Sequence, residues 1–213
     1  HWPRLGHPVV RKPGEKFRVR VACHYNELAS VTLRRMEGPA VISRQAPFKE
    51  HRELKYYYDR EMTVRIPQDI PAGLYDLVVT ISSPSTGQSK TTISPQSVYL
   101  VQEFPRNPVF ITFGHLDTSG QLQAEYLRRM ALMANLINPD MVLVSNAVNQ
   151  AYVSGALATL SMPYLITFGN HQVPGNQYWY GDAEGITDFG PECAILNFGP
   201  QWHDDLSKAH ALF

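Results

Sequence analysis

The 213-residue sequence predicts two domains of different class, an all-β sandwich followed by an α/β domain. Between residues 8 and 101 apolar side chains recur at every second position, as in strands with one buried and one solvated face. From residue 109 onward, short apolar runs alternate with helical periodicity, as in βαβαβ units. Pro105 and Pro108 interrupt the pattern between these regions. We therefore place the domains at residues 1–105 and 106–213.

In the first domain, alternation is clearest in residues 16–23, where Phe17 and every second residue after it are apolar. Turn signals rich in Pro, Gly and Ser separate the expected strands, at residues 13–14, 71–73 and 83–87. The segment 70–75 (IPAGLY) resembles the penultimate hairpin of many immunoglobulin-like and fibronectin-like domains, although the Cys–Trp–Cys arrangement of antibody domains is absent. We expect an immunoglobulin-like sandwich.

In the second domain, the apolar runs predict buried strands at residues 109–113, 141–144 and 164–168. The segment 151–160 predicts a short helix, and a longer amphipathic helix lies between the first two strands. That helix has Thr118 or Ser119 as a possible N-cap and is stopped by Asn138 and Pro139. Its expected apolar face consists of Leu122, Tyr126, Met130, Met133 and Ile137.

Polar residues follow each predicted strand of the second domain, in the segments 114–117, 145–149 and 169–172. Ligands of parallel sheets bind beyond the carboxyl ends of the strands. Imidazole and hard oxygen ligands suit Zn, Mn or Fe, so together these loops predict a divalent-metal and phosphate site. Taken singly, each loop is better explained as a turn than as a set of ligands, because Gly and Asn are good turn formers.

In order, spacing and flanks, the segments 111–116 (ITFGHL), 139–146 (PDMVLVSN) and 162–172 (MPYLITFGNHQ) resemble the motifs of calcineurin-like metallophosphoesterases. Residues 189–199 resemble the next strand of that family. The resemblance covers about half of the chain. It implies a partial α/β metallophosphoesterase-like domain.

The resemblance implies roles for three matching residues. His115 and Asn170 match metal-binding positions, and His171 matches the histidine that assists phosphoryl transfer. Phe113 stands where the family has the first metal-binding aspartate, and phenylalanine cannot bind a metal. Asn146 replaces the aspartate that bridges the two metals. The resemblance therefore predicts a weakened or empty site for Zn, Mn or Fe.

One more carboxylate of the motifs is lost, because Asn149 stands where the second motif has a further aspartate. Asp117, two residues beyond His115, is a minor alternative ligand. His203 and His210 follow, but neither lies in the Gly-His-x-His phrase of the family. Because 42 residues follow His171, we expect a fragment whose open sheet edge is covered by a missing C-terminal half or by a protein partner.

These observations lead to one functional hypothesis and one alternative. The hypothesis is a catalytically impaired metallophosphoesterase relative that serves as an extracytoplasmic structural or binding module. The alternative is an active metal-dependent phosphoesterase, acting on phosphomonoesters or phosphodiesters, whose reduced or displaced ligand set is completed beyond Phe213.

The composition and the first residue restrict the classes of partner and the cellular locations that we expect. Lys and Arg together number 19, as do Asp and Glu, which argues against nucleic-acid binding without a localised patch. No apolar run approaches the roughly 18 residues that span a membrane. A first residue His1 rather than Met favours a processed, secreted or periplasmic protein. We expect Cys23 and Cys193 not to be bonded to each other.

Overall fold

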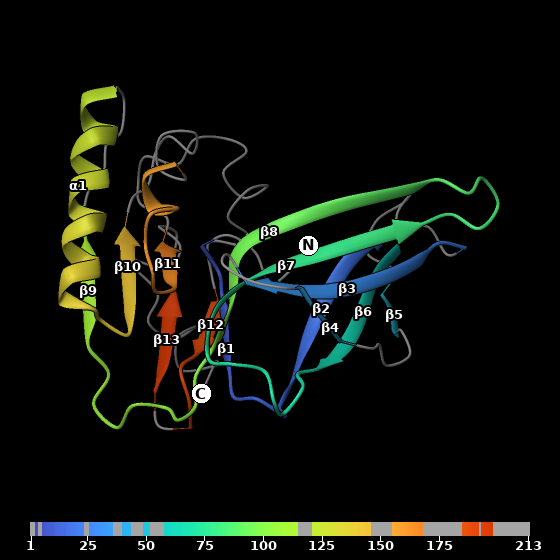
Figure 1. Ribbon diagram of the computed structural model, residues 1–213, viewed down its shortest axis with the longest axis horizontal. Helices are drawn as coiled ribbons and strands as arrows, with labels where there is room; N and C mark the ends of the chain where they lie inside the picture. Colours follow the sequence, from blue (N-terminus) through green and yellow to red (C-terminus); the bar gives the residue numbers. More distant parts are fainter. Residues whose placement is uncertain are drawn as a thin grey trace, which may run out of the picture. The chain divides into compact units, whose positions relative to one another are not determined.

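The computed structural model describes residues 3, 6–23, 26–35, 40–43, 49–51, 58–114, 121–145, 155–167, 185–191 and 193–197 (Figure 1). Contacts divide the chain into two compact units, His1–Phe104 and Pro105–Phe213. The described part of unit 1 is built from strands, whereas unit 2 adds a long helix to its strands.

The described part of unit 1 contains two sheets. A five-stranded sheet has the order β1-β8-β7-β3-β4, and a three-stranded sheet has the order β2-β6-β5. Adjacent strands are antiparallel except for β1 and β8, which are parallel. The strands are β1 (Val9–Arg11), β2 (Lys16–Cys23), β3 (Leu28–Arg35), β4 (Ala40–Ser43), β5 (Lys49–His51), β6 (Tyr58–Arg65), β7 (Gly73–Ser82) and β8 (Ser89–Leu100).

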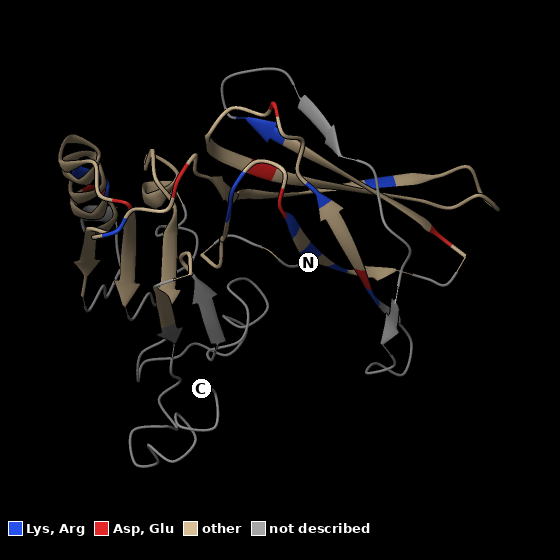
Figure 2. Cartoon of the chain, turned by 90° about the horizontal axis from the view of Figure 1, so that it is seen from below, with Lys and Arg blue, Asp and Glu red and all other residues tan. Residues whose placement is uncertain are grey.

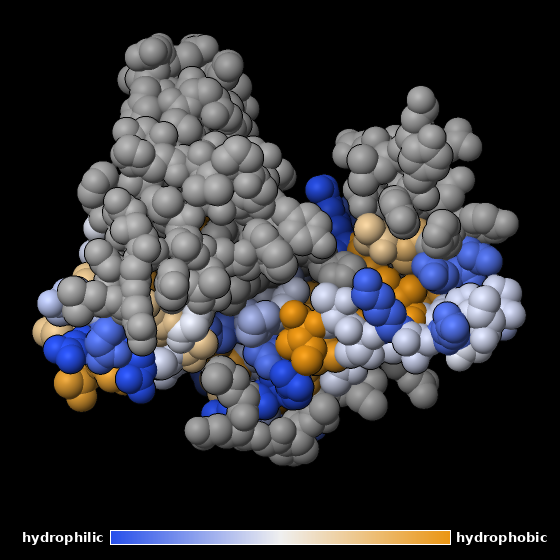
Figure 3. All heavy atoms as spheres, turned by 90° about the horizontal axis from the view of Figure 1, so that it is seen from above, coloured by the Kyte–Doolittle hydropathy of each residue, from blue (hydrophilic) through white to orange (hydrophobic). Residues whose placement is uncertain are grey.

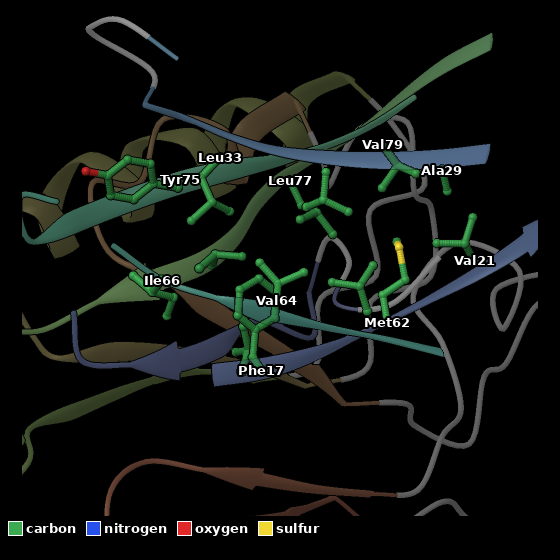
Figure 4. Close-up of a cluster of buried hydrophobic side chains, with 14 of the residues drawn as sticks. Phe17, Val21, Ala29, Leu33, Met62, Val64, Ile66, Tyr75, Leu77 and Val79 are labelled. Atoms are coloured by element: carbon green, nitrogen blue, oxygen red, sulfur yellow. The ribbon is translucent and has the colours of Figure 1, made fainter. Parts of the chain in front are cut away.

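The two sheets share one hydrophobic core (Figure 4). In β2 the predicted alternation is realised without a break, because Phe17, Val19, Val21 and Cys23 are buried while the residues between them are exposed. Buried side chains of β6, β3 and β7 complete the same cluster, including Met62, Val64, Leu33 and Leu77. Side chains from both sheets therefore stabilise unit 1 by removing apolar surface from water.

The segment 70–75 forms a local anchor at the start of β7. The buried Tyr75 hydroxyl donates a hydrogen bond of 2.7 Å to the carbonyl of Pro71, four residues upstream. A tyrosine bonded back to the preceding chain in this way also occurs in immunoglobulin-like domains. The bond fixes the corner at which the chain enters β7.

A register shift follows immediately in the pairing of β7 with β8. Tyr75 pairs with Val98, whereas Leu77 pairs with Ser94, so Asp76 has no ladder partner on β8. Its carboxylate instead accepts a hydrogen bond of 3.0 Å from the N–H of Gln96, whose φ is 50°. Asp76 also forms an ion pair with Arg34, its register partner on β3, at 2.7 Å. The buried Asp76 carboxylate thus accepts a hydrogen bond from the backbone of β8 on one side and forms an ion pair with Arg34 of β3 on the other.

The described part of unit 2 contains a three-stranded sheet, a long helix, a short helical segment and a two-stranded hairpin. Strands β9 (Phe110–Phe113), β10 (Met141–Ser145) and β11 (Tyr164–Thr167) are parallel in the order β11-β10-β9, and parallel pairing is what the sequence predicts for them. Helix α1 (Gln121–Ile137) connects β9 to β10, and β12 (Gly185–Asp188) pairs antiparallel with β13 (Ala194–Asn197). Of the predicted second helix, residues 155–157 are helical, and residues 151–154 lie outside the described residues.

Helix α1 ends where the sequence predicts. Asn138 has a φ of 54°, and its N–H donates to the carbonyl of Ala134 at 2.8 Å, immediately before Pro139. A left-handed Asn followed by Pro is an effective helix stop.

The buried face of α1 differs from the predicted one. Leu127, Ala131 and Ala134 are buried, whereas Tyr126, Met130, Met133 and Ile137 are 37–62% exposed. Apolar side chains accordingly reach the surface at the left of Figure 3, the end at which α1 lies in Figure 1. Two of the three residues in the buried stripe are alanines, while the larger apolar side chains lie on the exposed side of the helix. The sequence therefore identified the helix correctly but assigned it the wrong buried face.

In the part of the chain that the structure describes, no helix combines the length and the apolar character needed to cross a membrane. Cys23 is a buried free thiol and Cys193 is a partly buried one, as predicted.

Candidate functional site

The carboxyl ends of β9, β10 and β11 lie side by side. In the register, Phe113 of β9 pairs with Val144 of β10, and Ser145 of β10 pairs with Thr167 of β11. Because the strands are parallel, the segments that follow them begin at the same edge of the sheet. The three predicted loops therefore leave from neighbouring points.

Phe113 ends β9, and its side chain is 4% exposed. Side chains alternate along a strand, so Phe113 and Phe110 lie on opposite faces of the sheet. The ring of Phe110 packs edge-on against Phe189, with centroids 5.5 Å apart and an interplanar angle of 75°. The position that resembles the first metal-binding aspartate is thus occupied by a buried aromatic ring.

Ser145 links the ends of the two strands. Its hydroxyl donates a long hydrogen bond of 3.4 Å to the carbonyl of Phe113. Gly114 is exposed, and a Cβ at this position would lie 3.8 Å from Ser145 Oγ, which is an ordinary contact. Ser145 is the first residue of the predicted polar segment 145–149, but its hydrogen bond to Phe113 was not predicted.

The predicted site residues themselves lie beyond these strand ends. His115, Asp117, Asn146, Asn170 and His171 all fall outside the described residues. Asn149 and His203 do so as well. The structure thus describes the strand ends from which the predicted segments leave. It describes none of the predicted ligands.

The residues at this edge do not fit a dinuclear metal centre. Phe113 has no donor atom, and the candidates His115, Asn146 and Asn170 are neutral ligands, which leave the charge of two divalent cations uncompensated. Among the described residues, no three His, Cys, Asp or Glu side chains are grouped in a way that could hold a metal ion. We therefore derive no catalytic step through a metal.

At the amino ends of the three strands, the structure shows two sets of hydrogen bonds that were not predicted from the sequence. The Asp140 carboxylate accepts a hydrogen bond of 2.7 Å from the N–H of Val109, and Asp140 N–H donates to the carbonyl of Val109 at 2.8 Å. Asn135 of α1 donates to the carbonyl of Thr159 at 2.7 Å and accepts from the N–H of Ser161 at 2.9 Å. These links hold the segments that precede the three strands.

Comparison with known families and curated proteins gave no match for the chain. Among solved structures, amylomaltase from Corynebacterium glutamicum is 16% identical, with a TM-score of 0.33, over 70% of this chain and 22% of that one. A family 123 glycoside hydrolase from Clostridium perfringens is 11% identical, with a TM-score of 0.29, over 66% of this chain and 33% of that one. The chain thus spans about a fifth to a third of the length of these proteins. Likenesses this low establish neither a family nor an activity.

Proposed function

We propose that unit 2 is a metallophosphoesterase-like scaffold that has lost its metal-binding carboxylates and serves as a binding or assembly module. The observation that carries the proposal is the buried Phe113 at the end of β9, at the position of the family's first metal-binding aspartate. The parallel order of β9, β10 and β11 supports it, because the three motif segments then start at one edge of the sheet.

The chemistry of the remaining residues favours binding over catalysis. A histidine such as His171 contributes to phosphoryl transfer only when other groups hold the substrate beside it. With Phe113 and Asn146 in place of two aspartates, the loops retain hydrogen-bonding groups but little negative charge. Such a set can bind a neutral or anionic group through His and Asn side chains without activating water.

The test is hydrolysis of bis(p-nitrophenyl) phosphate by the purified protein in the presence of Mn²⁺ or Zn²⁺. The rate should stay near background, and H171A and H115A should leave that rate unchanged. His210 lies in none of the motif segments, so H210A serves as the matched control for loss of a histidine.

Turnover that depends on added metal, is lost in H171A and is kept in H210A would overturn the proposal. It would favour the alternative of an active phosphoesterase with displaced ligands. Repeating the assay with H203A and D117A would then identify those ligands.

A further inference from the structure

Among the described strands, β2 combines a position at the edge of its sheet with a row of cations. In the described three-stranded sheet β2-β6-β5, β2 pairs with β6 on one side only. Lys16, Arg18 and Arg20 occupy every second position and are exposed, with the side chains of Arg18 and Arg20 71% and 62% exposed. Figure 2 colours these basic residues blue. Because successive residues of one face lie about 6.7 Å apart, the three cations form a regular line.

The cations of this row are only partly compensated. Arg18 and Arg20 share the carboxylate of Glu61, each at 3.5 Å. Lys16 lies opposite Arg65 in the register, and like charges at directly opposed positions destabilise a sheet. The Glu61 side chain is only 13% exposed, but its single carboxylate neutralises at most one of the two arginines. The row thus carries an excess of positive charge that an anionic partner would relieve.

The edge also offers backbone hydrogen bonds. In an antiparallel pair, half of the N–H and C=O groups of a strand point to its partner and half point away. For β2 the second half faces the open side of the described sheet, apart from the carbonyl of Lys16, which accepts a hydrogen bond of 3.4 Å from Arg11 Nε. An extended peptide can add to such an edge as a new strand.

We propose that β2 binds an extended acidic peptide segment that pairs with its open edge. Side chains of paired strands share the same face and the same two-residue period. Asp or Glu at alternate positions of the peptide would therefore face Lys16, Arg18 and Arg20 in turn. Neither a nucleic acid nor a sulfated polysaccharide has a peptide backbone that could form the ladder, so the combination of edge and charge selects a peptide. The inference concerns unit 1 and is independent of the function proposed for unit 2.

The test measures binding of labelled peptides to the full chain by fluorescence polarisation at low salt. Acetyl-Thr-Glu-Thr-Glu-Thr-Glu-Thr-amide should bind, and acetyl-Thr-Thr-Glu-Glu-Glu-Thr-Thr-amide, which has the same composition without the alternation, should bind more weakly. Two further versions of the alternating peptide carry N-methyl groups, which remove N–H donors, on the Thr amides in one version and on the Glu amides in the other. One of the two should lose binding and the other should retain it, because only alternate amides face β2.

Variants of the chain distinguish an effect of the β2 cations from an effect of the net charge of the protein. R18Q/R20Q should weaken binding by about five- to tenfold. The control K90Q/R106Q, which removes two exposed cations elsewhere, should not change it. Circular dichroism verifies that both variants are folded.

Three results would overturn the proposal. These are no binding of the alternating peptide, equal binding of both N-methylated peptides, and an equal effect of the two double variants. Binding of an oligonucleotide or of heparin through Arg18 and Arg20, without binding of the peptide, would also replace it with a different ligand class.

Discussion

Asp140, the residue before β10, exchanges two hydrogen bonds with Val109, the residue before β9. Its carboxylate accepts from the N–H of Val109 at 2.7 Å, and its own N–H donates to the carbonyl of Val109 at 2.8 Å. One residue thus fixes the entry of two neighbouring parallel strands.

We expect D140A to loosen this end of the sheet by about 1 kcal/mol, because a hydrogen bond to a charged group is lost at an exposed position. Hydrogen exchange read by mass spectrometry should show faster exchange in the peptide that contains Val109 and Phe110. D140N, which keeps an acceptor oxygen, should exchange at nearly the wild-type rate. Unchanged exchange in D140A would show that the side chain is dispensable.

The Asp76 carboxylate is expected to be important for the stability of unit 1. Its side chain is 7% exposed and contacts both Arg34 and the N–H of Gln96. D76A should lower the free energy of unfolding by about 3 kcal/mol, because the bonds of a buried carboxylate are lost and the buried N–H of Gln96 is left without its acceptor. R34Q should cost only about 1 kcal/mol, since Arg34 is 44% exposed. Urea denaturation measures both, and equal costs for the two variants would contradict this ranking.

Tyr75 provides a test with a pH signature. Y75F should lower the free energy of unfolding by about 1 kcal/mol, because the hydrogen bond to Pro71 is lost. Burial raises the pKa of the Tyr75 phenol above its ordinary value of 10.0, although Arg35 opposes the shift. The wild type should therefore lose stability as the pH rises above 10, and Y75F should lose less over that range. The exposed residue Tyr126 supplies the control Y126F, which should match the wild type at every pH.

The two thiols should react at different rates. Burial raises the pKa of the Cys23 thiol above its ordinary value of 9.0, although Arg60 opposes the shift, so little thiolate is present at neutral pH. Cys193 is only partly buried. Iodoacetamide should therefore modify Cys193 first in the native protein, and both cysteines in urea. Faster labelling of Cys23 in the native state would mean that unit 1 opens readily around β2.

Strands β2, β9, β10 and β11 could be predicted from periodicity, because alternation and apolar runs are local properties of the chain. The buried stripe of α1 could not, since the sequence contains a second apolar arc, and only packing decides which arc is covered. Leu127, Ala131 and Ala134 are buried, whereas Tyr126, Met130 and Met133, which together have larger side chains, are exposed.

Of the candidate site, only the strand ends from which the predicted segments leave can be compared with the prediction. The ends of β9, β10 and β11 meet because parallel pairing and register follow from the three buried runs. The links made by Ser145, Asp140 and Asn135 were not predictable, because each joins residues more than 20 positions apart in the sequence through a single side chain.

The central proposal, that the strand ends of unit 2 do not hold a metal centre, is tested most directly by metal stoichiometry. The purified chain is dialysed against Zn²⁺ or Mn²⁺ and analysed by inductively coupled plasma mass spectrometry. We expect bound metal far below one ion per chain, because Phe113 is buried and has no donor atom. F113D/N146D should bind more metal than the wild type, and T112D, with a carboxylate on the neighbouring exposed residue of β9, should not. Stoichiometric metal in the wild type, lost in H115A or H203A, would contradict the account.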